Sequence, residues 1–435
     1  MINTMDSNEL KIIMVAPPGV GKTSFLAAMH EEFNKTFANA NINTWTSDSK
    51  TLFALEACKQ VLKNIDPKLQ KKKVTPTNPP DDPWEDEGFV FELGSGGKKF
   101  MKLRFTDPSG EYFSPTATSR QREYIEQQLQ ECDAVVVPID ATALTEMQSQ
   151  KVNDTGVGTW HQEVNNPSQI TNLLKNAYSS LEDNSVPRLI VLAPVKCETY
   201  MKYQKKADKL LDRVQKGYRD LLNHLKSPEL IDRVAVVVTP VQTIGNVAFS
   251  HHKTDSEGVT RFIYHKTPID APYSPQDGDQ PLRYILRFLI NIYLENQEKA
   301  ILKEKKKLEE SQGKLKTEKN KVKEVESKYI MAWEKFQNRE NMPGVFKGVA
   351  NWWDGLQNSR PDEIYEQVNK EYKDVTSSYE KFEREVETIS NNVKATEKQI
   401  KAFNEALSNF SQNCKNSAGF AILQGFKWLS HSKSL

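Results

Sequence analysis

The first 37 residues combine an apolar run, a glycine-containing turn and a helical pattern. The run at residues 10–15 has the length of a strand and consists mainly of isoleucine, leucine, valine and methionine. After the turn, apolar residues recur at helical spacing, namely Phe25, Leu26, Met29 and Phe33. The pattern predicts a strand, a loop and a helix in that order.

The turn has the residues of a phosphate-binding loop. Backbone N–H groups can surround a phosphate only where side chains are small, and the start of the following helix adds partial positive charge. Lys22 would contact the outer phosphates and the Thr23 hydroxyl would hold Mg²⁺. The first position of the motif is Ala16 instead of glycine, which is the smallest possible departure. The predicted nucleotide-binding residues here are Ala16, Pro17, Pro18, Gly19, Val20, Gly21, Lys22, Thr23 and Ser24.

Residues 51–64 repeat an amphipathic helical pattern, and residues 67–87 are rich in Lys, Pro and Asp and should form a loop. Two short apolar runs at residues 89–93 and 99–105 flank a glycine-rich turn, which predicts a β-hairpin. The second run ends at Asp107-Pro-Ser-Gly110.

This order of elements is the layout of a nucleotide switch. Asp107 can hold Mg²⁺ through water, and the Gly110 amide can face the terminal phosphate because glycine allows close backbone approach. A loop threonine would bind the metal only while that phosphate is present. Thr75 and Thr77 both qualify, and both also fit ordinary turn chemistry. We prefer Thr77 because it lies nearer the hairpin.

On these motifs, residues 10–292 resemble a GTPase domain of the TRAFAC class of P-loop proteins. Three further β-branched runs, at residues 132–140, 188–193 and 233–238, match the remaining core strands and suit a parallel sheet buried on both faces. The resemblance implies GTP as substrate and Mg²⁺ as cofactor. It also implies base contacts from Lys196, Glu198 and Thr239.

Two departures from the family pattern bear on chemistry. Val195 and Glu198 stand where the family has Asn or Thr and Asp, so an ATPase of the same fold stays an alternative. Glu111 follows Gly110 where many members carry a water-orienting Gln, and its negative charge predicts slow hydrolysis. The predicted catalytic residues are Lys22, Thr77, Gly110 and Glu111. Arg120 and Arg122 open the next helix, and we favour a solvated helix face over an arginine finger.

The C-terminal third has a heptad pattern. A helix beginning at Pro281 continues into apolar residues seven apart, from Ile301 to Phe336. Pro and Gly interrupt residues 342–360, and a stronger seam of three-and-four spacing then runs from Tyr372 to Cys414. The predicted fold class is therefore α/β. A mostly parallel P-loop GTPase domain over residues 1–292, with insertions at 141–185 and 246–281, precedes an antiparallel coiled-coil hairpin over 293–415.

The tip of the hairpin, with Trp352 and Trp353, and the tail at residues 416–435 are unusually apolar. Such clusters mark a protein partner, a membrane surface or internal packing, and all three stay open.

Composition narrows the function classes. The chain of 435 residues has 59 basic and 58 acidic side chains and a net charge of +1, which argues against a nucleic-acid partner. Its four scattered cysteines indicate reduced thiols, and no apolar stretch has membrane-spanning length. We expect a cytoplasmic protein, at most peripheral to a membrane. The adjacent His251 and His252 have no accompanying ligand set for a metal.

The sequence thus predicts a slow GTP-hydrolysing switch whose nucleotide state is coupled to a helical arm. A nucleotide-stabilised coiled-coil scaffold without hydrolysis is the alternative from another class, and Glu111 favours it.

Overall fold

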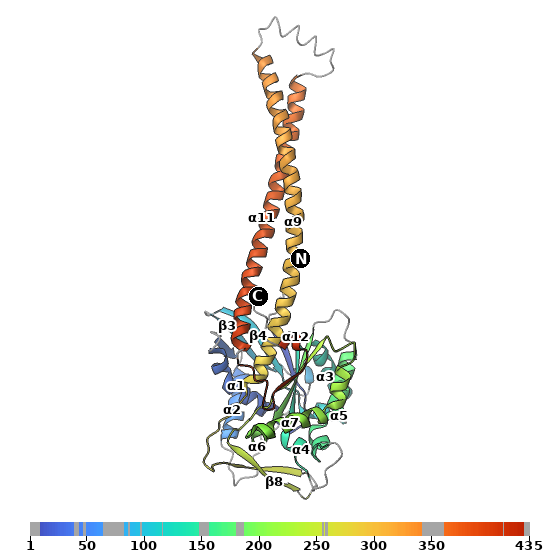
Figure 1. Ribbon diagram of the computed structural model, residues 1–435, viewed down its shortest axis with the longest axis vertical. Coiled ribbons are helices and arrows are strands. Elements are labelled where there is room, and N and C mark those ends of the chain that lie inside the picture. Colours follow the sequence, from blue (N-terminus) through green and yellow to red (C-terminus); the bar gives the residue numbers. More distant parts are fainter. Residues whose placement is uncertain are drawn as a thin grey trace. The chain divides into compact units, whose positions relative to one another are not determined.

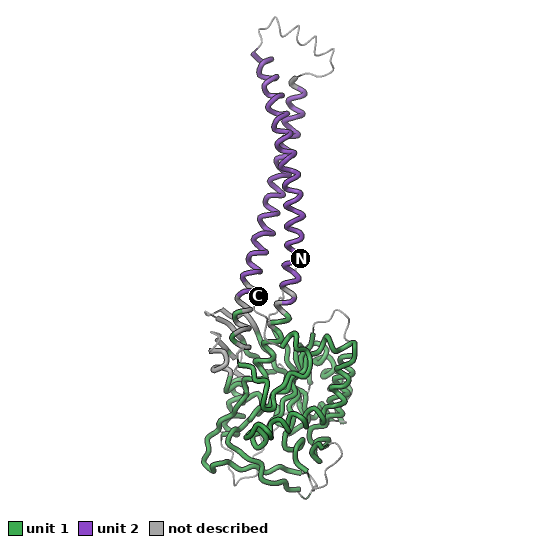
Figure 2. Tube along the Cα trace, in the orientation of Figure 1, with its two compact units in different colours: residues 1–292, 405–435 green, residues 293–404 purple. Residues whose placement is uncertain are grey.

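The computed structural model divides the chain into two compact units (Figure 2). Unit 1 holds residues 1–292 and 405–435, and unit 2 holds residues 293–404. The described residues are 9–38, 43–46, 49–63, 82–85, 88–95, 98–114, 116–147, 156–179, 187–254, 256, 260–341, 361–411 and 413–429.

Unit 1 consists of a sheet with helices packed around it (Figure 1). The sheet has eight strands, in the order β10-β7-β6-β5-β1-β4-β3-β2. The five strands from β7 to β4 are parallel, and β10, β3 and β2 join the edges antiparallel. The strands are β1 Glu9–Met14, β2 Asn43–Thr46, β3 Phe89–Ser95, β4 Lys98–Thr106, β5 Ala134–Asp140, β6 Arg188–Val195, β7 Val234–Val238 and β10 Ala421–Gln424.

The central strands are buried on both faces. Alternate residues of β1, β5, β6 and β7 pack with residues of α3 (Ser119–Glu131), α5 (Pro167–Ser179), α7 (Gln204–Gly217) and α8 (Arg219–Leu225) in one apolar cluster. The intervening residues, such as Met14, Val136 and Val237, are fully buried as well. This two-sided burial explains the continuous β-branched runs. The four predicted core runs and both runs of the predicted hairpin are confirmed as strands.

The remaining elements of unit 1 connect or extend the sheet. They are α1 (Lys22–Ala38), α2 (Ser49–Lys63), α4 (Ala141–Thr145), α6 (Glu198–Met201) and α12 (Phe426–Leu429), the short η1 (Pro83–Glu85), η2 (Gly110–Phe113) and η3 (His161–Asn165), and the two-stranded sheet of β8 (Val247–Thr254) and β9 (Thr260–Lys266). The last two strands and α4, η3 and α5 lie in the segments that the sequence marked as insertions.

The C-terminal tail forms part of unit 1. Strand β10 pairs with β7, and the side-chain amide of Gln424 donates to the carbonyls of Leu225 at 2.9 Å and Val234 at 2.8 Å. Trp428 is buried and packs edge-on against Phe288 at 5.8 Å between ring centroids. For the described part of the tail, the structure therefore shows internal packing.

Unit 2 is a pair of long helices. Helix α9 runs Asp279–Glu340, its first turns belonging to unit 1, and α11 runs Pro361–Ser411. Lys305 pairs with Glu397 at 2.9 Å, whereas Tyr329, further along α9, stacks on Tyr372 at 5.2 Å. The residue numbers of the partners on α11 decrease as those on α9 increase, so the two helices are antiparallel.

Burial along the pair follows the predicted heptads. Ile301 and Val325 are buried on α9, and Val393 is buried on α11. The predicted tip, with Trp352 and Trp353, lies outside the described residues. Across the described helices, none is both long and apolar enough to span a membrane.

We expect Gln424→Ala to lower the free energy of unfolding by about 1–3 kcal/mol, because it removes two buried hydrogen bonds to the Leu225 and Val234 carbonyls. Urea denaturation measures this change. Gln312→Ala is the matched control, since Gln312 is exposed on α9, and it should stay within about 0.5 kcal/mol of wild type. Equal stability of the two variants would contradict the role of Gln424 in holding β10.

Candidate functional site

The loop between β1 and α1 has the backbone of a phosphate cradle. Gly19 and Gly21 have φ of 79° and 121°, a region that favours glycine. Lys22 is the first residue of α1, and its Nζ donates to the carbonyl of Ala16 at 3.0 Å across the loop. Burial lowers the pKa of Lys22, and the nearby Asp107 carboxylate acts in the opposite direction.

Thr23 and Asp107 meet beside this loop. The Thr23 hydroxyl donates to Asp107 Oδ2 at 3.1 Å, although 84 positions separate the two residues. They meet because β1 and β4 are parallel neighbours, with Ile13 opposite Thr106, so both chains leave the sheet at the same edge. A hydroxyl and a carboxylate are the hard oxygen donors that Mg²⁺ prefers, so this pair fits the predicted metal.

Gly110 lies directly against the phosphate loop. A Cβ added at Gly110 would lie 2.3 Å from the nitrogen of Pro18 and 2.8 Å from the carbonyl carbon of Pro17. Only a residue without a side chain allows this approach. Glu111 is exposed, and its amide bonds to the Ser109 hydroxyl at 3.4 Å. Phe113 lies beside the lysine, with Lys22 Nζ 5.8 Å from the ring centroid.

Lys196 connects the phosphate loop to the neighbouring strand ends. Its backbone is left-handed, with φ of 53°, which is uncommon for a residue with a side chain. Its Nζ donates to the carbonyl of Gly19 at 2.9 Å and to Asp140 Oδ2 at 2.7 Å. Non-glycine residues in this conformation concentrate at functional sites, where surrounding contacts hold them in place.

Glu198 is buried at the start of α6, with 3% of its surface exposed. Its Oε1 accepts the backbone amides of Ile244 at 2.9 Å and Gly245 at 3.3 Å. Burial raises the pKa of Glu198, and these amides oppose the shift. In this arrangement the carboxylate braces the loop that follows β7.

A cavity of about 160 Å³ lies beside these residues. It is lined by Gly21, Ser24, Leu62, Val195, Lys196, Glu198, Thr243, Ile244, Val247 and Tyr264. The hydroxyl of Tyr264, which comes from the β8–β9 insertion, is 2.7 Å from that of Thr142. Thr239 is fully buried and does not line the cavity. Thr243, Ile244 and Val247 line it instead, four, five and eight positions after Thr239.

The structure therefore brings together three separate segments of the chain: the phosphate loop, the segment with Asp107 and Gly110, and the segment with Lys196 and Glu198. Thr75 and Thr77 lie outside the described residues. Sequence reasoning missed Asp140, Ile244 and Tyr264. Asp140 had one usable signal, because it ends a buried strand next to β1, where the strand order changes direction and α/β proteins place their ligands.

Comparison with known proteins adds one finding to this geometry. The family model Double-GTPase 2 matches residues 12–236, which is just over half of the chain. The match begins in β1 and ends in β7, so it covers the phosphate loop and the central strands. No curated protein matches the chain. The TRAFAC class stays a prediction.

We expect Gly110→Ala to displace the segment at residues 110–113 from the phosphate loop, because the added methyl group would overlap the Pro18 backbone. Hydrogen exchange at the Tyr112 and Phe113 amides should become faster, and the free energy of unfolding should fall by about 1–3 kcal/mol.

Gly313→Ala is the matched control, since nothing lies within 4 Å of its added Cβ. That change in a helix should stabilise the protein by up to about 1 kcal/mol. Unchanged exchange in the Gly110 variant would contradict the close contact described above.

Proposed function

Because the chain belongs to the Double-GTPase 2 family, we propose that it binds GTP with Mg²⁺ and hydrolyses it slowly, as a switch that acts on its helical hairpin. The observation that carries the nucleotide part is the convergence of three groups on one loop. Lys22 crosses the loop to Ala16, Thr23 meets Asp107, and Lys196 bonds to Gly19.

Each group has a distinct task in this proposal. The loop amides and the Lys22 ammonium bind the phosphates, and the Gly110 amide approaches the terminal phosphate. Thr23 and Asp107 hold Mg²⁺, which when bound neutralises charge on the phosphates. The stem of Lys196 and the cavity beside Tyr264 receive the base. Exposed Glu111 offers no positive charge to the transferred group, which supports slow hydrolysis.

ATP is the second candidate substrate, and Glu198 is the observation that favours it. A guanine reader needs a carboxylate that accepts from the base, whereas Oε1 of Glu198 already accepts two loop amides. GTP selectivity therefore requires the second carboxylate oxygen, or a rearrangement of the loop at Ile244 and Gly245 when the base enters.

Coupling to the hairpin is supported by contacts of the base-side loop within unit 1. Gln242 and Gln276 exchange backbone hydrogen bonds of 3.0 and 2.9 Å, and Ser274 N donates to the Ile244 carbonyl at 3.0 Å. The loop that would contact the base is thus paired with the segment that leads into α9.

Gly278, the residue before α9, also contacts the helix of the phosphate loop. A Cβ at Gly278 would lie 2.5 Å from the Ala28 carbonyl oxygen of α1. The segment that follows α11 contacts the same region. Lys415 pairs with Asp277, and the Lys415 amide donates to Gln280 Oε1 at 2.8 Å. A nucleotide-dependent shift of α1 or the base loop would therefore reach both ends of the hairpin.

We expect wild type to bind a fluorescent GTP analogue with Mg²⁺ and Lys22→Ala to bind it about 10- to 100-fold more weakly. This range corresponds to the loss of a charged hydrogen bond. Equilibrium fluorescence titration measures both, and unlabelled ATP tests selectivity by displacement.

Lys209→Ala is the control, because Lys209 is an exposed lysine of α7 and its removal should leave affinity unchanged. Displacement by ATP in preference to GTP would move the protein to the ATPase alternative. Binding without phosphate release would favour the scaffold, and no binding of either nucleotide would refute the proposal.

The coupling predicts that a non-hydrolysable GTP analogue changes amide hydrogen exchange at residues 273–285 and 413–424, compared with the nucleotide-free protein. The same comparison in Lys22→Ala should show a much smaller change at an analogue concentration that saturates only wild type. Exchange that changes only around the phosphate loop would contradict the coupling and leave nucleotide binding intact.

A further inference from the structure

A chain of buried polar groups continues outward from Lys196. Asp140 Oδ2 receives the Lys196 ammonium, while Asp140 Oδ1 accepts the amides of Thr142 and Ala143, both at 3.0 Å. The Asp140 backbone is in turn bonded at both polar groups by one side chain. Its amide donates to Asn165 Oδ1 at 2.7 Å, and its carbonyl accepts from Asn165 Nδ2 at 3.1 Å.

His161 completes the chain. Because Asn165 Oδ1 accepts the Asp140 amide, Nδ2 is the donor that faces His161 Nδ1 at 3.0 Å. His161 Nδ1 therefore accepts, and Nε2 carries the hydrogen that is donated to the Gly217 carbonyl at 3.3 Å. Burial lowers the pKa of His161 to about 4, so the neutral ring that this pattern requires is present at neutral pH.

The polar chain formed by Asp140, Asn165 and His161 is buried, which restricts its movement. Asp140 is 1% exposed, Asn165 0% and His161 5%. Each polar atom at the joints has a named partner, and in a low-dielectric interior an unpaired atom would be costly. A displacement at one end must therefore move the next group or break a buried hydrogen bond.

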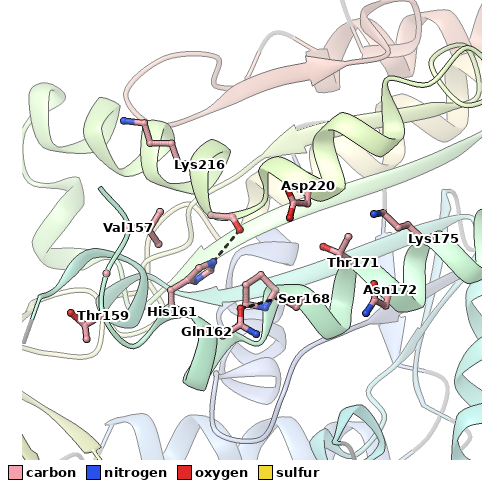
Figure 3. Close-up of a pocket in the computed structure, with 13 residues that line it drawn as sticks. Val157, Thr159, His161, Gln162, Ser168, Thr171, Asn172, Lys175, Lys216 and Asp220 are labelled. Atoms are coloured by element: carbon pink, nitrogen blue, oxygen red, sulfur yellow. Dashed lines mark hydrogen bonds between the residues drawn. The ribbon is translucent and has the colours of Figure 1, made fainter. Parts of the chain in front are cut away.

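The outer end of the chain lies in the wall of an open cavity of about 500 Å³ between α5 and the junction of α7 and α8 (Figure 3). His161 bonds to the Gly217 carbonyl in this wall, and Thr171 and Asn172 lie on the neighbouring α5. A Cβ at Gly217 would lie 2.6 Å from His161 Nε2, so the ring leaves no room for a side chain there.

We propose that Asn165 and His161 are positioning residues for nucleotide binding: they hold Asp140, and Asp140 holds the Lys196 ammonium against the phosphate loop. This inference rests on the proposed function. It assigns a role to the insertion at residues 141–185, whose residues contribute both side chains but do not line the nucleotide cavity, and it makes Gly217 a remote point of control.

The rival explanation is that the hydrogen-bonded side chains of Asn165 and His161 only anchor the insertion to the sheet. Both explanations predict lower stability when the chain is broken. They differ in whether the effect on nucleotide binding depends on Lys196, and a double-mutant cycle measures that dependence.

The experiment measures the dissociation rate of a fluorescent GTP analogue with Mg²⁺ from the full-length protein at neutral pH. Gly217→Ala and Asn165→Leu are each made in wild type and in a Lys196→Met background. Gly217→Ala is the milder change, because it displaces the ring without removing a polar group, and it carries the test if Asn165→Leu does not fold.

Both variants should raise the dissociation rate about tenfold in wild type, as expected for one weakened charged hydrogen bond. In the Lys196→Met background, the same changes should alter the rate less than twofold. Asn172→Ala is the matched control, since Asn172 is an exposed residue of the same cavity wall outside the chain, and it should have no effect in either background.

If each change altered the dissociation rate by the same factor in both backgrounds, the inference would be overturned and an anchoring role would remain. An unchanged dissociation rate in wild type would overturn it as well. If wild type bound no nucleotide, or if Lys22→Ala bound it as well as wild type, the proposed function would fail and this inference with it. If nucleotide binding required Lys22 but was unchanged by Gly217→Ala and Asn165→Leu, only this inference would be refuted.

Discussion

The two hydrogen bonds of the Lys196 ammonium join loops from three different strands. Gly19 follows β1, Asp140 ends β5 and Lys196 follows β6, and these three strands are neighbours in the parallel part of the sheet. Since parallel strands end at one edge, their loops converge without any bend in the sheet. One cation then braces the phosphate loop and offsets the negative charge of a buried carboxylate.

The two insertions contribute side chains to the region around Lys196. The insertion after β5 supplies Asn165, which bonds to the Asp140 backbone, and the β8–β9 insertion supplies Tyr264, which lines the cavity beside Lys196 and Glu198. Glu198 holds the loop after β7 by two amides, and that loop is paired with the chain entering α9. Polar groups that are buried together in this way specify one arrangement, because each alternative leaves a donor or acceptor unsatisfied.

The helical hairpin departs from and returns to the same unit. Its first helix starts beside α1, and the returning chain is tied to Asp277 and Gln280 before it adds β10 to the far edge of the sheet. Arg287 and Asn291, on the first turns of α9, donate to the backbone carbonyls of Leu429 and Trp428 at 2.6 Å each. Both crossings into unit 2 are therefore anchored in unit 1, by the segment beside α1 and by the C-terminal tail.

The sequence by itself determined the core strands, the phosphate loop, the Asp107–Gly110 segment and the heptads, because each follows from local backbone geometry and residue spacing. Only the tertiary structure decided which buried polar groups meet. Asp140 and Asn165 are 25 positions apart, and the short run at β10 has no periodicity to show that it is an edge strand. Glu198 was predictable as a site residue, but its bonds to the Ile244 and Gly245 amides depend on two loops that only the strand order brings together. Partners of buried polar groups are set by topology, which residue spacing does not specify.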